Sequence, residues 1–255
     1  MLNCYRIFIL LLFVNLQVYG QRIEKSGVAD SIRWNEFTLH SNQWGLYKIK
    51  KGNYQQRIYK ENGIVGWDWQ VPTKSYGVIG YPMIQIGVDP WTKLINVNKS
   101  NFYQDLTKTR QFDVTYSAKL NTTKEKYNLA FDFWLHTSEK VGYENIATEV
   151  MIWEDYQKFK PFGKKKGTIL TSNGSYTVYI GKIYKKELQK GWNYIAFVRN
   201  QPRTQGSLNI MDFISYLKSN QLLGEGIYLS SFEFGTEILN ASGSIQIQQY
   251  DINIQ

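Results

Sequence analysis

Three stretches of this chain alternate between large apolar residues and acidic or mixed residues with a period of two. The apolar positions are Phe131, Phe133, Leu135, Val150, Ile152, Phe232 and Phe234, and the interleaved positions are Asp132, Trp134, Glu149, Met151, Trp153, Glu233, Gly235 and Glu237. Because successive side chains of a strand point to opposite faces, each stretch predicts a strand with one apolar face and one acidic face. Together they predict a curved sheet whose back packs on a core and whose front forms a groove lined by carboxylates, Trp and Met.

Other stretches carry the same kind of signal. Residues 111–120 alternate most regularly, and further strands are expected over 31–40, 42–50, 56–61, 64–70, 81–87, 168–172, 175–184, 192–199 and 244–254. The dipeptide Asn62-Gly63 predicts a tight hairpin turn between two of them. Near the C-terminus, Ile245 and Ile247 fall out of step with Ile252, which predicts a bulge at Gln248-Gln249.

One stretch has helical spacing instead. Ile210, Phe213, Ile214 and Leu217 recur at intervals of three and four, and Ser207 or Asn209 provides a cap. About a dozen strands with one helix predict an all-β fold, because a sheet with one apolar face must bury that face against a second layer. The expected architecture is a two-sheet antiparallel sandwich of the jelly-roll, concanavalin-like type, with the helix packed on it, in a single domain over 21–255.

The first twenty residues predict a secretory signal peptide. Arg6 precedes the apolar run 7–14, and the segment ends with a small residue, Gly20. The run is too short to span a membrane, so no stable membrane association is expected. Cys4, the only cysteine, lies inside this segment, which leaves a mature chain without thiols or disulfides. The predicted location is extracellular, or periplasmic in a bacterium.

The formal net charge of +9 does not by itself indicate nucleic acid as a partner. The densest cluster, Lys164-Lys165-Lys166, follows Pro161-Phe162-Gly163 and is interpreted as a solvated loop. His40 and His136 stand among polar residues without a partner at metal-ligand spacing, so both are interpreted as surface residues. The sequence therefore predicts no bound nucleic acid, no metal site and no cofactor.

The acidic positions suit glycoside hydrolysis, which needs one carboxyl group to protonate the leaving oxygen and a second to attack the sugar or activate water. Glu149 and Glu237 are the candidate pair. Asp132 is the third candidate, because a neighbouring carboxyl group changes the proton affinity of a nucleophilic Glu149. The alternative is that all three are ordinary exposed strand residues.

Aromatic and apolar residues beside these acids are candidates for binding sugar. Trp44 offers a ring for stacking and Asn42 an amide for a hydroxyl group, although a single Trp in a strand often belongs to a core. Met151, Trp153 and Trp134 share the acidic faces. An apolar side chain such as Met151 on such a face indicates that substrate covers it.

Several of these segments, in this order, resemble glycoside hydrolase family 12, a family of compact jelly-roll endoglucanases. They are Asn42-Gln43-Trp44-Gly45, Gly66-Trp67-Asp68-Trp69, Tyr81-Pro82, Phe131-Asp132-Phe133-Trp134, Glu149-Val150-Met151-Ile152-Trp153, Pro161-Phe162-Gly163, Met211-Asp212-Phe213 and Phe234-Gly235-Thr236-Glu237. The resemblance runs from about residue 40 to the C-terminus.

The resemblance implies specific roles. Glu149 would be the nucleophile of a retaining mechanism, Glu237 the acid/base, and Asp132 a helper hydrogen-bonded to the nucleophile. Asn42 and Trp44 would belong to the sugar platform on the non-reducing side, and Met151 to the cleft floor. The chain departs from many members in lacking an N-terminal disulfide, and the segment 83–91 differs from the expected pattern.

The leading hypothesis is thus a secreted, monomeric retaining endo-β-1,4-glucanase that acts on cellulose-like chains, xyloglucan or mixed-linkage glucan. A competing hypothesis is a catalytically silent, lectin-like sandwich that binds β-glucan in the same groove. A third is a secreted scaffold or adhesion domain that neither binds nor cleaves glucan.

Overall fold

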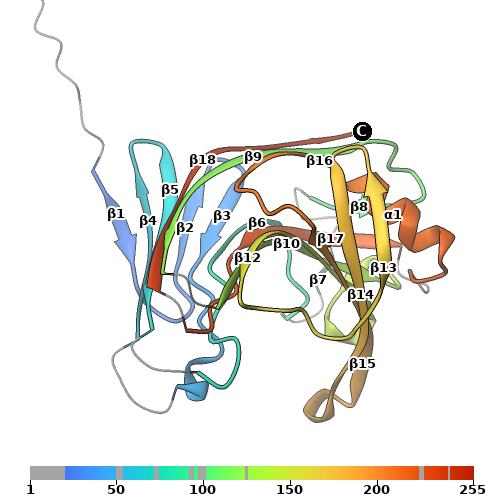
Figure 1. Cartoon of the computed structure of the whole chain (residues 1–255), viewed down its shortest axis with the longest axis horizontal. Helices are drawn as coiled ribbons and strands as arrows, with labels where there is room; N and C mark the ends of the chain where they lie inside the picture. Colours follow the sequence, from blue (N-terminus) through green and yellow to red (C-terminus); the bar gives the residue numbers. More distant parts are fainter. Residues whose placement is uncertain are drawn as a thin grey trace, which may run out of the picture.

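Two packed sheets make up most of the protein in the computed structural model, which describes residues 21–49, 54–71, 75–91, 95–96, 102–123, 126–223, 227–240 and 242–255 (Figure 1). The six-stranded sheet has the order β1 (Ile23–Lys25), β4 (Gln55–Glu61), β5 (Ile64–Gln70), β18 (Ser242–Ile254), β9 (Phe112–Thr122) and β16 (Gln205–Asn209). The predicted signal peptide, residues 1–20, lies outside the described residues.

The second, ten-stranded sheet carries the acidic stretches. Its order is β13 (Lys164–Thr171), β14 (Gly174–Lys185), β15 (Lys190–Arg199), β12 (Ile146–Gln157), β10 (Tyr127–His136), β17 (Tyr228–Gly235), β6 (Met83–Gly87), β3 (Phe37–His40) and β2 (Ser31–Trp34), with β8 (Gln104–Asp105) also paired to β17. A separate two-stranded pair joins β7 (Ile95–Asn96) to β11 (Lys140–Val141). In Figure 1, β18 and β9 run across the top of the view, above β12, β10 and β17.

Pairing in both sheets is antiparallel except between β12 and β15, which run parallel. Strand β10 is central, because it pairs with β12 on one side and β17 on the other. The predicted two-sheet sandwich with one helix is therefore confirmed, and the three acidic stretches are neighbours within one sheet.

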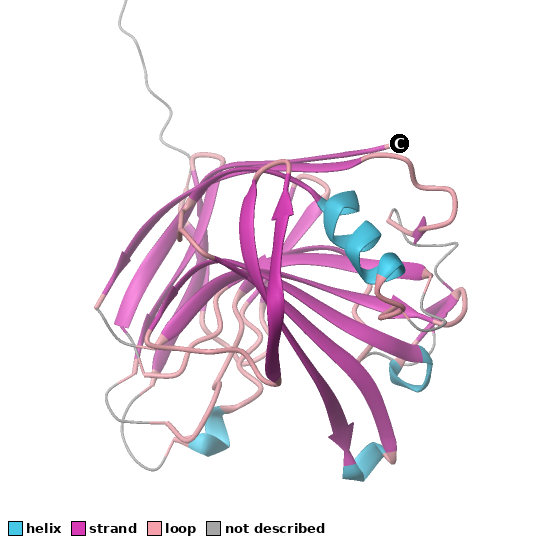
Figure 2. Ribbon diagram, turned by 45° about the vertical axis from the view of Figure 1, so that its right-hand side comes forward, coloured by secondary structure: helices cyan, strands magenta, loops and turns pink. Residues whose placement is uncertain are grey.

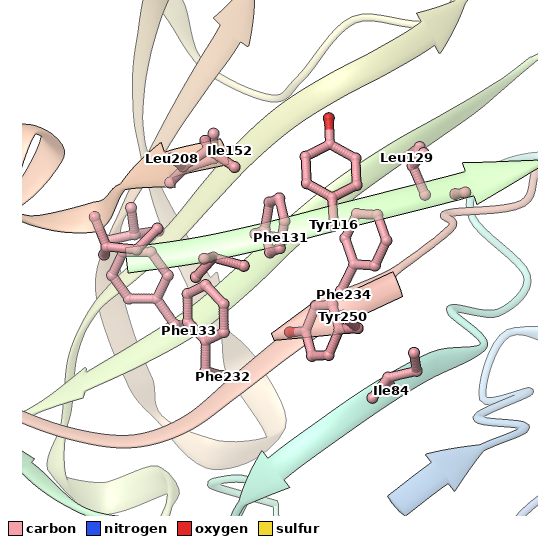
Figure 3. Close-up of a cluster of buried hydrophobic side chains, with 14 of the residues drawn as sticks. Ile84, Tyr116, Leu129, Phe131, Phe133, Ile152, Leu208, Phe232, Phe234 and Tyr250 are labelled. Carbon is pink, nitrogen blue, oxygen red and sulfur yellow. The ribbon is translucent and has the colours of Figure 1, made fainter. Parts of the chain in front are cut away.

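The apolar faces of β10, β12 and β17 form the core between the sheets, as the alternation predicted. Phe131 and Phe234 stack with ring centroids 4.5 Å apart, and Tyr116 and Tyr250 of the opposite sheet contact them (Figure 3). The apolar faces of these three strands are fully buried. Burying a side chain of this size stabilises the fold by about 1.5–3 kcal/mol, so these strands anchor the site that they carry.

The helix α1 (Ile210–Ser219) packs as its spacing predicted. The Asn209 side chain accepts a hydrogen bond from the backbone N–H of Met211 (3.0 Å), which confirms one of the two candidate caps. Phe213 lies edge-on to Tyr176 and to Phe197, with both pairs of ring centroids 5.0 Å apart. Figure 2 shows the helix in cyan beside the magenta strands. Within the described residues no helix is long and apolar enough to cross a membrane.

Two predictions of local structure are confirmed and one is wrong. The hairpin through Asn62-Gly63 is confirmed, since both residues have the positive φ angles (49° and 79°) of a tight primed turn. The bulge near Gln248 is confirmed by a register shift between Ile247 and Gln249. The strand predicted over 42–50 is wrong, because its described part forms a 3₁₀ turn at Leu46–Lys48.

The interpretation of the lysine cluster as a loop is also wrong. Lys164, Lys165 and Lys166 begin strand β13, where all three side chains are exposed. This strand lies at the end of the ten-stranded sheet, with β14 as its partner there. Lysines that point to solvent gave no alternation, so the sequence predicted this strand only over 168–172 and missed its basic start.

Candidate active site

The outer face of the ten-stranded sheet, turned away from the core, brings the predicted acids together. We call this the site face; its residues include Asp132, Glu149, Met151 and Glu233. Across β10 and β12, Asp132 lies opposite Met151 and Trp134 lies opposite Glu149. Across β10 and β17, Asp132 lies opposite Glu233.

Glu149 is held in the sheet by β12 and is almost completely buried, with 9% of its surface exposed. Its Oε2 accepts a hydrogen bond of 2.7 Å from the indole N–H of Trp192 on β15. Burial raises the pKa of Glu149 to about 7, while the Trp192 bond and the positive charge of Lys185 lower it. This carboxyl group is therefore poised to change its charge near neutral pH.

Asp132 is also buried, and its Oδ1 has no hydrogen-bond partner in the part of the chain that the structure describes. Burial and the charges of Glu149, Glu233 and Glu237 raise its pKa well above the usual value. These effects favour the protonated form of Asp132, in which the carboxyl group acts as a hydrogen-bond donor.

Glu237 follows β17 rather than lying within it, and it is half-buried. Asn128 of β10 binds Glu237 through two hydrogen bonds. The Asn128 Oδ1 accepts a bond from the Glu237 backbone N–H (2.9 Å), and the Asn128 amide N–H donates to Glu237 Oε2. Burial raises the pKa of Glu237 to about 8; the Glu149 charge also raises it, while the Asn128 bond and Lys48 lower it. The charge of Glu149 is felt by Glu237, which indicates that the two carboxyl groups lie in the same part of the site face.

Met151 and Trp153 lie on the site face but are covered by protein. The hydroxyl of Tyr194 donates a 3.4 Å hydrogen bond to the Met151 sulfur. Trp153 is fully buried, and the Phe159 ring packs on it with centroids 4.9 Å apart. Contacts of these two residues with sugar stay predictions.

Trp134 belongs to a group of three indoles beside Glu149. Its ring lies 5.9 Å from that of Trp192, and Trp91 packs edge-on against both, at 5.2 and 5.8 Å. Trp134 and Trp192 are buried, whereas 48% of Trp91 is exposed. The solvent-facing ring at this position is therefore Trp91, which leaves the predicted sugar contact of Trp134 untested.

Trp44 and Asn42 lie away from the strands, in the segment that leads to the 3₁₀ turn Leu46–Lys48. The Trp44 ring is 48% exposed, and the Lys48 ammonium group stands 4.1 Å above its centroid. Asn42 has a positive φ of 42° and donates a hydrogen bond to the Met83 sulfur (3.7 Å). Because Lys48 also lowers the pKa of Glu237, this segment is electrostatically linked to the acidic group.

These observations agree with comparisons to known proteins. A model of the family described as Glycosyl hydrolase family 12 matches residues 35–255. This chain belongs to that family. Endoglucanase S of Pectobacterium parmentieri is 33% identical over 225 residues, or 87% of this chain and 83% of that protein. Xyloglucan-specific endo-beta-1,4-glucanase A of Emericella nidulans is 22% identical over 247 residues, or 92% of each chain.

Solved structures of family 12 share the fold. A family 12 xyloglucanase from Bacillus licheniformis, in complex with ligand, is 28% identical with a TM-score of 0.80, over 91% of this chain and 100% of that one. Endoglucanase Cel12A from Rhodothermus marinus has a TM-score of 0.74 at 20% identity, over 91% and 99% of the two chains. Family membership makes this chain a glycoside hydrolase.

The sequence did not predict several residues that contact the candidate acids and their neighbours. Asn128, Trp192 and Tyr194 contact the candidate residues directly, and Glu233 was placed on the acidic face without a role. Extending the alternation of β10 back from Asp132 through Ala130 would have reached Asn128. No local signal identifies Trp192, because it depends on β15 pairing in parallel with β12.

Two expectations about the surroundings are wrong. The acidic faces were expected to be exposed, yet Asp132, Glu149 and Glu233 are all buried. His136 is completely buried as well, with its Nε2 2.9 Å from the Ser230 hydroxyl, rather than lying on the surface. The site face of this family 12 chain is therefore covered by side chains, and its carboxyl groups are largely removed from water.

Proposed function

We propose that this family 12 chain is a secreted, retaining endo-β-1,4-glucanase, with Glu149 as nucleophile, Glu237 as acid/base and Asp132 as the helper of Glu149. The observation that carries the proposal is the unequal setting of the two glutamates. Glu149 is buried and accepts an indole N–H bond from Trp192, whereas Glu237 is half-buried and is held by Asn128 through its backbone N–H and its carboxyl group. Different environments for the two carboxyl groups are the arrangement that acid and nucleophile roles require.

In the first step, Glu149 attacks the anomeric carbon as a carboxylate while protonated Glu237 donates its proton to the leaving oxygen. This forms a covalent glycosyl–enzyme ester and breaks the glycosidic bond. In the second step, Glu237 takes a proton from water, which attacks the same carbon and releases Glu149. Two inversions give net retention, for which the two carboxyl groups stand about 5–5.5 Å apart.

Surrounding residues support these roles. The hydrogen bond from Trp192 and the charge of Lys185 stabilise the ionised form of Glu149, as a nucleophile needs. The two contacts from Asn128 hold Glu237 in one orientation. Protonated Asp132 donates to Glu149 and withdraws charge from it when the ester forms.

The proposed substrate is a β-1,4-linked glucan: a cellulose-like chain, xyloglucan or mixed-linkage glucan. The names of the relatives, an endoglucanase and xyloglucan-specific enzymes, support this choice. The exposed ring of Trp44 and the side chain of Asn42 are proposed to contact sugar on one side of the acids, and Met151, Trp153 and Trp134 to form the floor. No metal, cofactor or nucleic acid enters the proposed reaction.

Anomeric NMR of the first product tests the mechanism. Wild-type enzyme digesting xyloglucan, barley β-glucan or carboxymethylcellulose, with xylan as a comparison, is expected to release new reducing ends in the β form. Initial release of the α form would contradict the retaining mechanism. Binding of glucan without new reducing ends would favour a lectin-like sandwich, and neither binding nor cleavage would favour a scaffold.

Azide rescue separates the two glutamates. In Glu149→Gly, azide is expected to occupy the vacated site and give an α-glycosyl azide from an activated substrate. In Glu237→Ala, azide attacks the ester and gives a β-glycosyl azide, because the nucleophile is intact. The same azide anomer from both variants would contradict the assigned roles.

Secretion and single-domain organisation have their own test. Expression of the full chain is expected to yield an extracellular or periplasmic protein that begins at Gln21, as measured by mass spectrometry. Size-exclusion chromatography with light scattering is expected to give the mass of one 21–255 monomer.

A further inference from the structure

Glu233 is a buried acid on the site face to which the proposed mechanism gives no role. It lies on β17, with only 3% of its surface exposed. Its Oε1 accepts a hydrogen bond of 3.1 Å from the Ser231 hydroxyl, and no ion pair reaches it within the described residues. A carboxyl group buried without a cation is costly to ionise, so its presence calls for a function.

The sheet register aims Glu233 at the helper acid. Glu233 of β17 and Asp132 of β10 are directly opposite each other, and side chains so placed have Cβ atoms about 4.5–5.5 Å apart. On its other side Glu233 faces Gln85 of β6, which carries no charge. Asp132 is thus the acidic group that shares a cross-strand pair with Glu233.

One carboxyl oxygen of Asp132 is available to accept a hydrogen bond from Glu233. Its Oδ1 is buried and has no hydrogen-bond donor in the described part of the chain. Two buried carboxyl groups this close do not both ionise, so the pair retains a proton. A protonated Glu233 would supply the donor that Asp132 Oδ1 lacks.

We propose that Glu233 is a positioning residue: it stays protonated in the working enzyme and donates a hydrogen bond to Asp132 Oδ1, which keeps the proton of Asp132 directed at Glu149. This inference rests on the proposed roles of Asp132 and Glu149. The three acids Glu233, Asp132 and Glu149 then share two protons and a single negative charge, which resides on the nucleophile.

The surrounding charges agree with a protonated Glu233. Besides Asp132, the charges of Glu149 on β12 and of Asp89 after β6 affect the pKa of Glu233. The charge of Glu233 in turn raises the pKa of Tyr250 in the opposite sheet. Burial and the charges of Asp89 and Glu149 raise the pKa of Glu233 to about 8, and the Ser231 bond lowers it. Each acidic neighbour therefore favours the form that donates.

Two substitutions at Glu233 distinguish donation from charge. Glu233→Gln keeps an N–H donor and cannot ionise, whereas Glu233→Leu has a similar size and no donor. We expect kcat within about threefold of wild type for Glu233→Gln and at least about tenfold lower for Glu233→Leu, with KM changed less than twofold in both. Equal losses in both variants would mean that an ionised carboxylate is needed, and unchanged kcat in both would mean no role; either result overturns the proposal.

A matched control lies two residues away on the same strand. Ser231→Ala removes the hydroxyl that binds Glu233 Oε1 but leaves the Asp132 side intact, so kcat is expected to stay within about twofold of wild type. In the double variant Asp132→Asn with Glu233→Leu, the loss should be no greater than in Asp132→Asn alone, because Glu233 acts through Asp132. Additive losses would contradict that route.

A measurement without turnover covers the case in which Glu233→Leu fails to fold. The infrared difference spectrum of wild type minus Glu233→Gln at pH 6 is expected to contain the carbonyl stretch of a protonated carboxylic acid. Its absence would overturn the proposal even if the enzyme is active. If the band is present but Glu149→Gln retains full activity, the proposed function fails while the protonation state of Glu233 stands.

Discussion

Glu149 and Glu154 stand five residues apart on strand β12, so their side chains point to opposite faces of the sheet. Both are buried, but Glu154 lies in the interior between the sheets and is fully satisfied. Its oxygens accept hydrogen bonds of 2.6 Å from Tyr176, Tyr116 and Arg203, and Arg199 lies 3.9 Å away. Glu149 has one indole N–H and acidic neighbours instead.

The difference separates a structural acid from a chemically active one. The cations and hydroxyl groups around Glu154 compensate for its loss of hydration, and its hydrogen bonds link β12 to both sheets. Burial of Glu149 is compensated only in part, which leaves its proton affinity high and its charge easily changed. Burial alone therefore does not identify a functional acid; the partners do.

The largest expected effect is on activity at Glu149. Glu149→Gln is expected to lower kcat/KM on β-glucan by roughly 10⁴-fold, because an amide does not form the glycosyl ester. Its unfolding midpoint should equal or exceed that of wild type, since a partly compensated acid is removed. Reducing-end assays and thermal denaturation measure the two quantities, and substantial remaining activity would remove the distinction between the two glutamates.

Substitution of Glu154 is expected to reduce the stability of the protein rather than its activity. Glu154→Gln leaves Arg203 and Arg199 without their buried carboxylate, and is expected to lower the free energy of unfolding by about 3 kcal/mol. The fraction that remains folded should keep kcat near the wild-type value at low temperature. Denaturant titration measures the loss, and a variant that is fully stable yet inactive would reverse the comparison.

A smaller effect is expected when the indole N–H bond to Glu149 is removed. Trp192→Phe keeps most of the ring packing but loses the N–H bond that favours the ionised carboxylate, so the pKa of Glu149 should rise. The acid limb of the kcat/KM profile then moves to higher pH, and activity at pH 6 falls by about tenfold. A pH profile that coincides with that of wild type would show that the bond does not tune Glu149.

The smallest effect is on the pH dependence of stability. The pKa values of Glu149, Glu237 and Glu233 are raised from 4.5 to about 7, 8 and 8. At pH values between the ordinary and the raised pKa of each group, the folded state binds more protons than the unfolded state. The free energy of unfolding therefore falls as pH rises through this range. Glu149→Gln removes one contribution and should gain on the order of 1 kcal/mol relative to wild type between pH 5 and pH 8. Equal pH slopes for both proteins, measured by denaturant titration, would contradict this.

The alternation of apolar and polar residues was enough to predict the sandwich and the neighbouring acidic strands, and the Asn62-Gly63 dipeptide predicted a turn. It works because a half-buried strand imposes a period of two on its own sequence. It missed the start of β13, where Lys164, Lys165 and Lys166 are all exposed. It predicted β10 but not the burial of both faces of that strand.

The site was predicted less completely than the fold. Residues on the acidic strands, such as Glu149 and Asp132, follow from alternation within one segment. The partners that give those acids their properties come from other strands: Trp192 from β15, Asn128 from the far end of β10, and Glu233 through its register with Asp132. Contacts across strands depend on register, and a single sequence does not encode register locally.

The lysines at the start of β13 have a consequence for the enzyme in concentrated solution. An outermost strand presents unpaired backbone groups to which a strand of another molecule can add, and that is a common route to aggregation. Three successive ammonium groups on β13 repel the same strand of a second copy and oppose such growth. The basic cluster thereby protects the sheet that carries the acids from joining its counterpart on a neighbouring molecule.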